Sequence, residues 1–278
     1  MSASQLLRRS LLALCMALIA AGVFAQVQPP KEPFQPQVGQ DGKDVVWVPT
    51  PQALVDKMLD MAKVTPQDYV MDLGSGDGRT VITAAKRGAR ASGIEYNPNM
   101  VELSTRNAAK EGVGDKATFV KADLFESDFS KATVITMFLL TDINLKLRPR
   151  LLDLKPGTRV VSNTFTMGEW QADETATLTD DCTSWCTALL WIVPAKVAGT
   201  WRLPQGELAL KQDFQMISGT LTSAGATTPI TNGRLRGNQI TFTASGAQYT
   251  GRVNGSAVEG TVASGGGNSV WSATRAGQ

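Results

Sequence analysis

A glycine-rich loop, residues 74–78, contains the residues best suited to bind a nucleotide. It follows a predicted strand over residues 69–73 and precedes a helix predicted to begin at Asp77, which is the context that a nucleotide-binding loop requires. Glycines allow the backbone to turn sharply and to approach a ligand closely. Glu95 ends the next predicted strand about twenty residues later, where a carboxylate can bind both hydroxyls of a ribose. The spacing therefore predicts a nucleoside-containing ligand.

The charges around this loop narrow the choice of ligand. The glycines follow a G-x-G-x-G pattern, and Asp72 and Asp77 flank them. Dinucleotide sites instead carry G-x-G-x-x-G and place a pyrophosphate at the helix N-terminus. Two carboxylates would repel a pyrophosphate but suit a ligand with a cationic amine and a sulfonium. Electrostatics thus favours S-adenosylmethionine over NAD, and a glycine turn without a ligand is the remaining alternative.

The segment D-L-G-S-G-D-G-R, residues 72–79, resembles motif I of the class I methyltransferases. The resemblance covers about residues 45–193 and implies that Asp72 holds the methionine end of the cofactor. It also implies that Glu95 binds the ribose and that Asp123 contacts the adenine amino group. The cofactor site implied in this way comprises Asp72, Gly74, Ser75, Gly76, Glu95, Tyr96, Asp123 and Leu124.

Shorter segments resemble a narrower group within that superfamily. W-V-P-T-P at residues 47–51, together with residues 72–79, looks like bacterial relatives of mitochondrial protein-lysine methyltransferases. Residues 137–140, 147–149 and 167–170 look like features of a bacterial group of methyltransferases. The resemblance implies protein lysine as the leading acceptor. The N-terminal export signal and the C-terminal segment described below depart from the mitochondrial enzymes, so the acceptor itself stays unidentified.

The methyl acceptor is expected at the carboxyl ends of the strands. Phe138, Asp142 and Asn144 follow the fourth predicted strand and are the candidates for the acceptor wall. Asn144 could equally cap a helix or face solvent, and Phe138 could equally pack in the core. The chain lacks histidine, but methyl transfer depends mainly on positioning a nucleophile, so a dedicated base is often unnecessary.

The periodicity of the chain predicts two domains. From residue 45 to 194, strands alternate with helices, which indicates an α/β domain with a Rossmann-like, seven-stranded methyltransferase sheet. Residues 195–278 lose the helical spacing and show short alternating segments with Asn-Gly turns. This pattern is typical of an antiparallel all-β meander, either a small barrel or a sandwich. No residue set in it is suited to catalysis.

The charge and the residue composition of the chain argue against nucleic acid and metal ions as partners. The chain holds 27 Lys and Arg against 25 Asp and Glu, and Arg8 and Arg9 lie in the first 25 residues, which contain no acid. The remainder carries 25 residues of each sign and no net charge. A neutral body without a basic run argues against nucleic acid, as does the absence of the Asn/Asp-Pro-Pro-Tyr/Phe motif of amine-directed nucleic-acid methyltransferases. Without histidine, we expect no metal site.

The N-terminus is predicted to be a targeting segment. Residues 1–25 combine two arginines, an apolar run and a small-x-small cleavage pattern, which is typical of a secretory signal. The run is short for a membrane span, so we expect cleavage, a periplasmic location and no stable membrane insertion. An uncleaved anchor is the alternative, and Arg8-Arg9 also resembles a twin-arginine signal. Residues 26–44 are rich in Pro, Gln and Gly and predict a linker.

After cleavage, Cys182 and Cys186 are the two cysteines left. In an oxidising compartment, this close pair predicts a disulfide, with a redox or metal pair as the alternative.

The sequence as a whole predicts an S-adenosylmethionine-dependent methyltransferase. The competing hypothesis is an exported module that binds a ligand on the same fold without turnover.

Overall fold

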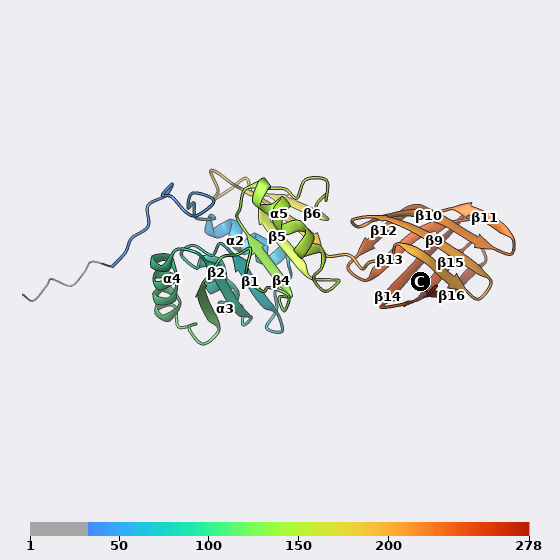
Figure 1. Ribbon diagram of the computed structural model, residues 1–278, viewed down its shortest axis with the longest axis horizontal. Helices are drawn as coiled ribbons and strands as arrows, with labels where there is room; N and C mark the ends of the chain where they lie inside the picture. The colour runs from blue at the N-terminus through green and yellow to red at the C-terminus, as the bar shows by residue number, and fades with distance from the viewer. Residues whose placement is uncertain (1–32, 278) are drawn as a thin grey trace, which may run out of the picture. The chain divides into compact units, whose positions relative to one another are not determined.

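The computed structural model describes residues 33–277 and contains a seven-stranded sheet with the order β3-β2-β1-β4-β5-β7-β6 (Figure 1). Strands β1 to β5 pair in parallel, and β7 runs antiparallel to both β5 and β6. This arrangement confirms the predicted Rossmann-like methyltransferase sheet. Its strands are β1 (Tyr69–Leu73), β2 (Arg90–Glu95), β3 (Ala117–Lys121), β4 (Val134–Met137), β5 (Arg159–Asn163), β6 (Glu174–Thr177) and β7 (Thr187–Ile192).

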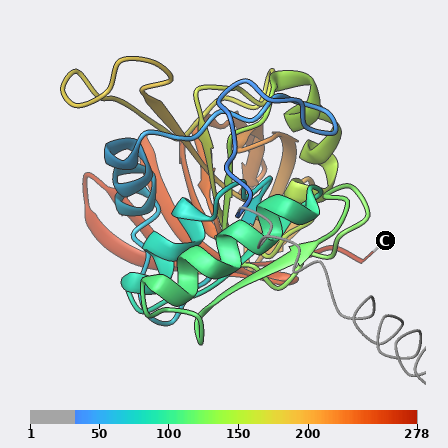
Figure 2. The same ribbon diagram turned by 90° about the vertical axis from the view of Figure 1, so that its left-hand side faces the viewer.

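Side chains that alternate along the strands build one core on each face of the sheet. Val70 and Val134 pack with the buried side of α2 and α3, whereas Met71 and Ile135 pack with α5. A strand places successive side chains on opposite faces, so buried strands of a two-faced sheet are apolar throughout. The helices are α2 (Gln52–Met61), α3 (Arg79–Lys86), α4 (Pro98–Lys110) and α5 (Thr141–Leu152), and Figure 2 shows α4 across the front of the sheet.

The order of the strands determines where a ligand can bind. From β1 the chain proceeds outward through β2 and β3, and it then returns to the other side of β1 with β4. Loops leaving β1 and β4 therefore diverge at this reversal and leave a crevice at the carboxyl ends of the strands. The glycine-rich loop follows β1, and Phe138 follows β4, so the sheet topology brings these two segments to one place.

The C-terminal region is an antiparallel sheet that closes into a barrel, which confirms the predicted meander and selects the barrel over the sandwich. Closure comes from the pairing of β9 with β10, and β11 attaches to β10. Alternate residues point inward, as in β13, where Ile240, Phe242 and Ala244 are buried. Its strands are β8 (Gly199–Leu203), β9 (Gly206–Asp213), β10 (Met216–Ser223), β11 (Ala226–Pro229), β12 (Thr231–Arg236), β13 (Gln239–Ala244), β14 (Ala247–Asn254), β15 (Ala257–Ser264) and β16 (Gly267–Arg275).

The predicted signal segment, residues 1–25, and the first part of the predicted linker lie outside the described residues. Within residues 33–277, none of the helices combines the length and the apolar character needed to cross a bilayer.

Candidate active site

The glycine-rich loop lies at the carboxyl end of β1 and lines a pocket. The amides of Gly74 and Ser75 both donate to the carbonyl of Ile94, at 2.9 and 3.0 Å, which ties the loop to the end of β2. Gly76 has a φ of +53°, and a Cβ there would lie 2.6 Å from the indole nitrogen of Trp47. This positive φ and the close approach of Trp47 together favour glycine here. The buried Ser75 hydroxyl lacks a hydrogen-bond partner within the described chain.

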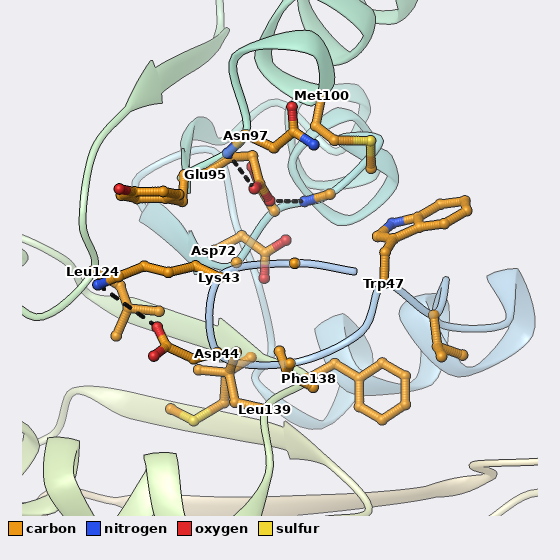
Figure 3. Close-up of a pocket in the computed structure, with 18 of the residues that line it drawn as sticks. Lys43, Asp44, Trp47, Asp72, Glu95, Asn97, Met100, Leu124, Phe138 and Leu139 are labelled. Carbon is orange, nitrogen blue, oxygen red and sulfur yellow. Dashed lines mark hydrogen bonds and ion pairs between the residues drawn. The ribbon is translucent and has the colours of Figure 1, made fainter. Parts of the chain in front are cut away.

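Glu95 is held by two backbone amides at the end of β2. Its carboxylate accepts from the amide of Gly76 at 3.0 Å and from the amide of Asn97 at 2.9 Å. Figure 3 shows both bonds, with Glu95 between the loop and Asn97. Each carboxylate oxygen can accept a further bond, so the group is preoriented for a pair of hydroxyls. This geometry suits the ribose role that the resemblance implies.

Asp72 is the buried acid of the pocket, with 6% of its surface exposed. Burial raises the pKa of its carboxyl to about 7, a hydrogen bond from Thr136 opposes the rise, and the negative charges of Glu95 and Asp77 add to it. The Thr136 hydroxyl donates at 2.6 Å. A cation placed beside this carboxyl would restore its charged form, so the site favours a positively charged ligand group.

Asp77 has a different role from the one that its position suggested. Its carboxylate pairs with the guanidinium of Arg79 at 2.6 Å, and Arg79 also donates to the carbonyl of Thr50 at 2.9 Å. The charge of Asp77 is thus largely balanced within the chain. Of the two carboxylates that flank the loop, Asp77 is paired with Arg79, whereas Asp72 has no ion-pair partner among the described residues.

Tyr96, Asp123 and Leu124 line the far end of the pocket, where the resemblance places an adenine. The ring of Tyr96 is half exposed, which leaves a face available for stacking. Asp123 accepts from the amide of Phe125 at 2.9 Å. It also pairs with the ammonium of Lys43 at 2.5 Å, and this pair holds the pKa of the Asp123 carboxyl below its usual range.

Lys43 was missed by sequence reasoning because it falls in the stretch predicted as a linker. Its ammonium lies 5.1 Å from the centre of the Tyr96 ring as well as beside Asp123. Residues 40–50 line the pocket together with the loop. The motif at residues 47–51 was the one available signal that this stretch belongs to the site.

The three acceptor candidates have separate positions. Phe138 lines the pocket, whereas Asp142 and Asn144 are not among its lining residues. Asp142 is exposed at the start of α5. Asn144 is fully buried, and its amide donates to the carbonyls of Phe165 and Thr166 at 3.1 and 3.2 Å. Asn144 therefore holds a neighbouring segment, and Phe138 alone of the three candidates faces the pocket.

Two further aromatic residues, Phe165 and Trp185, line the pocket beside Phe138 and were not predicted. The ring centres lie 5.9 Å apart for Phe138 and Phe165, 5.8 Å for Phe138 and Trp185, and 5.3 Å for Phe165 and Trp185. We call these three residues the aromatic wall. The structure also joins Cys182 and Cys186 in a disulfide next to Trp185.

The pocket residues fit S-adenosylmethionine. The tight turn at Gly76 leaves room for a closely approaching ligand, Glu95 offers two acceptor oxygens, and the buried Asp72 is suited to a cation. Residues 33–277 contain no cluster of three or more metal-ligating side chains. The arrangement can thus hold an adenosyl group with a cationic amino-acid end and present an apolar wall beside it.

Comparison with known proteins points to the same chemistry. The family model of the ANTKMT methyltransferase domain matches residues 72–174. A protein-lysine N-methyltransferase of Saccharolobus islandicus (strain REY15A) is 48% identical over 139 residues, which are 49% of this chain and 86% of that protein. The adenine nucleotide translocase lysine N-methyltransferase of Mus musculus is 34% identical over 119 residues, which are 42% of this chain and 52% of that protein.

A solved structure is similar over a comparable share of the chain. It is an RNA methyltransferase from Salinibacter ruber in complex with S-adenosyl-L-homocysteine, with a TM-score of 0.51 and 47% identity. The match covers 54% of this chain and 96% of that one. These two relatives and the solved structure take in 42% to 54% of the present chain, and the family model spans a shorter segment.

Proposed function

The chain belongs to the S-adenosylmethionine-dependent methyltransferases of class I, and from that premise we propose that its acceptor is the side-chain amine of a lysine in a protein. The lysine methyltransferases of Saccharolobus islandicus and Mus musculus support this acceptor. Within the pocket, the observation that carries the proposal is the aromatic wall beside the cofactor residues. An apolar surface suits an aliphatic side chain with an amine at its tip.

The chain's residues supply position and charge for the transfer. Gly76 and Glu95 would hold the adenosyl part, and Asp72 would hold the cationic end. S-adenosylmethionine, when bound, would supply the methyl group to the lone pair of a neutral amine, with the electrons of the carbon–sulfur bond left on sulfur and the proton of the amine released to solvent. Alignment accounts for most of the acceleration expected from such a site.

RNA is the competing acceptor, because the similar protein from Salinibacter ruber is named an RNA methyltransferase. The charge of the present chain weighs against it. Beyond residue 25 the acidic and basic residues are equal in number, at 25 each. Proteins that bind RNA backbones normally carry a basic surface, because phosphate contacts supply much of the affinity.

A labelling experiment separates the two acceptors. The full chain is incubated with S-adenosylmethionine carrying a labelled methyl group and with either the protein or the RNA fraction of the host cell. We expect label in protein, released as methyl-lysine after acid hydrolysis, and much less label with the Glu95→Ala variant at a limiting concentration of S-adenosylmethionine. Label that is lost on ribonuclease treatment would overturn the lysine proposal while leaving the methyltransferase activity in place.

We also propose that the protein is exported to the periplasm. Support comes from the signal pattern of residues 1–25 and from the Cys182–Cys186 disulfide, since disulfides persist in oxidising compartments. Residues 1–40 fused to a reporter that is active only after export test this proposal. Activity lost in an Arg8→Lys, Arg9→Lys version would indicate the twin-arginine route. A reporter that stays attached to the membrane would indicate the uncleaved anchor instead.

A further inference from the structure

The aromatic wall is assembled from three loops at the carboxyl edge of the sheet. Phe138 follows β4, Phe165 follows β5, and Trp185 lies in the loop that leads into β7. The three ring centres are within 6 Å of one another. Leu139, next to Phe138, would lie 3.1 Å from a Cβ at Gly74, so the wall adjoins the part of the pocket where the methionine end is expected.

Trp185 is the least protected member of the wall. It is 43% exposed, and its backbone has a φ of +59°, a conformation that bulky side chains rarely adopt. Such a conformation persists where the surrounding structure holds it. The disulfide between Cys182 and Cys186 closes the short loop that contains Trp185, and the carbonyl of Cys186 accepts from the amide of Leu178 at 2.9 Å.

Phe165 is positioned by a different device. The side-chain amide of the fully buried Asn144 donates to the carbonyls of Phe165 and of the residue that follows it. The chain thus contains a separate support for each of two wall residues, one through an amide and one through a disulfide.

We infer that the aromatic wall is the binding surface for the acceptor lysine side chain, and that the Cys182–Cys186 disulfide is the device that positions Trp185 in it. This inference rests on the proposed lysine acceptor. Aromatic faces pack well against the methylene stem of lysine and attract its ammonium group as it enters. Close to the wall, loss of water disfavours the charged ammonium and so favours the neutral amine that attacks the methyl group.

The inference makes Trp185 a specificity residue and the two cysteines positioning residues. Reduction of the disulfide would then weaken acceptor binding while leaving the cofactor residues, which lie on other segments, unaffected. In a reducing compartment the enzyme would bind cofactor and work poorly on its acceptor, whereas in an oxidising one both steps would proceed.

The test measures binding of a small probe to the full chain saturated with S-adenosylhomocysteine. The probe is N-acetyl-lysine methylamide, and its norleucine analogue, which lacks the amine, is the matched control ligand. Calorimetry is run on the wild type, Trp185→Ala, Trp185→Phe and the double variant Cys182→Ser, Cys186→Ser. Val270→Ala, an exposed position in the barrel, serves as the control variant. The affinity of each variant for S-adenosylhomocysteine is measured first and shows that the site is folded.

We expect Trp185→Ala and the double cysteine variant to weaken binding of the lysine probe by about fivefold or more, and Trp185→Phe to recover most of it. Affinity for S-adenosylhomocysteine should stay within about twofold throughout. Equal probe binding by all variants, or no probe binding by the wild type, would overturn the inference. Failure of the wild type to transfer label to lysine in protein, with probe binding intact, would instead overturn the proposed function.

Discussion

The two sides of the pocket are built in contrasting ways. On the cofactor side, residues 74–78, Glu95 and Asp123 lie at or just beyond the carboxyl ends of parallel strands, and backbone amides orient both carboxylates. On the acceptor side, the aromatic wall combines loops after β4 and β5 with the disulfide loop that precedes the antiparallel strand β7. One side is fixed by backbone geometry and the other by side-chain packing and a covalent link.

This contrast indicates how the two sides can change. A glycine with positive φ or a carboxylate bonded to two amides has few substitutes, because another residue would lose the backbone fit or the charge. Aromatic side chains in contact can be exchanged for one another at modest cost. We therefore expect the cofactor side to tolerate little substitution, and we expect substitutions in the aromatic wall to change the specificity for the acceptor.

The largest expected effect is on the glycine loop. Gly76→Arg should lower affinity for S-adenosylmethionine by more than about a hundredfold, because the new side chain needs an unfavourable φ and meets Trp47 at once. Calorimetric titration of the full chain measures this effect. Gly112→Arg is the matched control, since Gly112 also has a positive φ but has open space around it. Similar losses in both variants would show that backbone strain alone, and not the site, explains the result.

The next effect concerns the ribose. Glu95→Ala should weaken the binding of S-adenosylmethionine by roughly ten- to a hundredfold, because charged hydrogen bonds to two hydroxyls are lost. Glu102→Ala on α4, which removes an exposed carboxylate paired with Arg106, is the control and should leave affinity unchanged. An effect of Glu95→Ala below twofold would mean that the ribose lies elsewhere, and the comparison between the two sides would fail.

The pH dependence of cofactor binding tests Asp72. In the free protein its pKa is raised to about 7, and a bound cation should lower this pKa. Binding then releases a proton below pH 7, so affinity should fall as the pH decreases, by up to about tenfold per pH unit, and level off above pH 7. Asp72→Asn should bind more weakly and lose this dependence. A wild-type affinity that is constant from pH 6 to pH 8 would contradict the assignment of Asp72 to the cationic end.

The smallest effect is expected at Lys43. Its ion pair with Asp123 is partly exposed, and water and salt screen such pairs, so each contributes little. Removing this ion pair in Lys43→Ala should strengthen the binding of S-adenosylmethionine by no more than about fivefold at low salt, because Asp123 becomes free to bind the adenine amino group. Lys86→Ala, which removes another exposed ion pair, is the control. Weaker binding by Lys43→Ala would show that Lys43 itself contacts the ligand.

The parts of the site that could be predicted are those in which the residue type and its place in the local sequence pattern indicate its role. Gly74 and Gly76 were identified because glycines allow such a loop to turn sharply, and Glu95 because an acid at the end of the next strand can bind the ribose hydroxyls. Phe165 and Trp185 were missed because aromatic residues occur in every core. Lys43 was missed because its stretch has the composition of a linker, and its partner Asp123 lies eighty positions away.

The sequence by itself determined the α/β sheet, the change to an all-β region after residue 194 and the identity of the cofactor loop, since each depends on local periodicity or local backbone demands. Tertiary structure alone decided that Arg79 donates to the carbonyl of Thr50, that Asn144 supports Phe165 and that Trp185 packs beside Phe138. These contacts form because the sheet brings the ends of distant strands to one edge, and pairing between distant residues leaves no mark on local residue patterns.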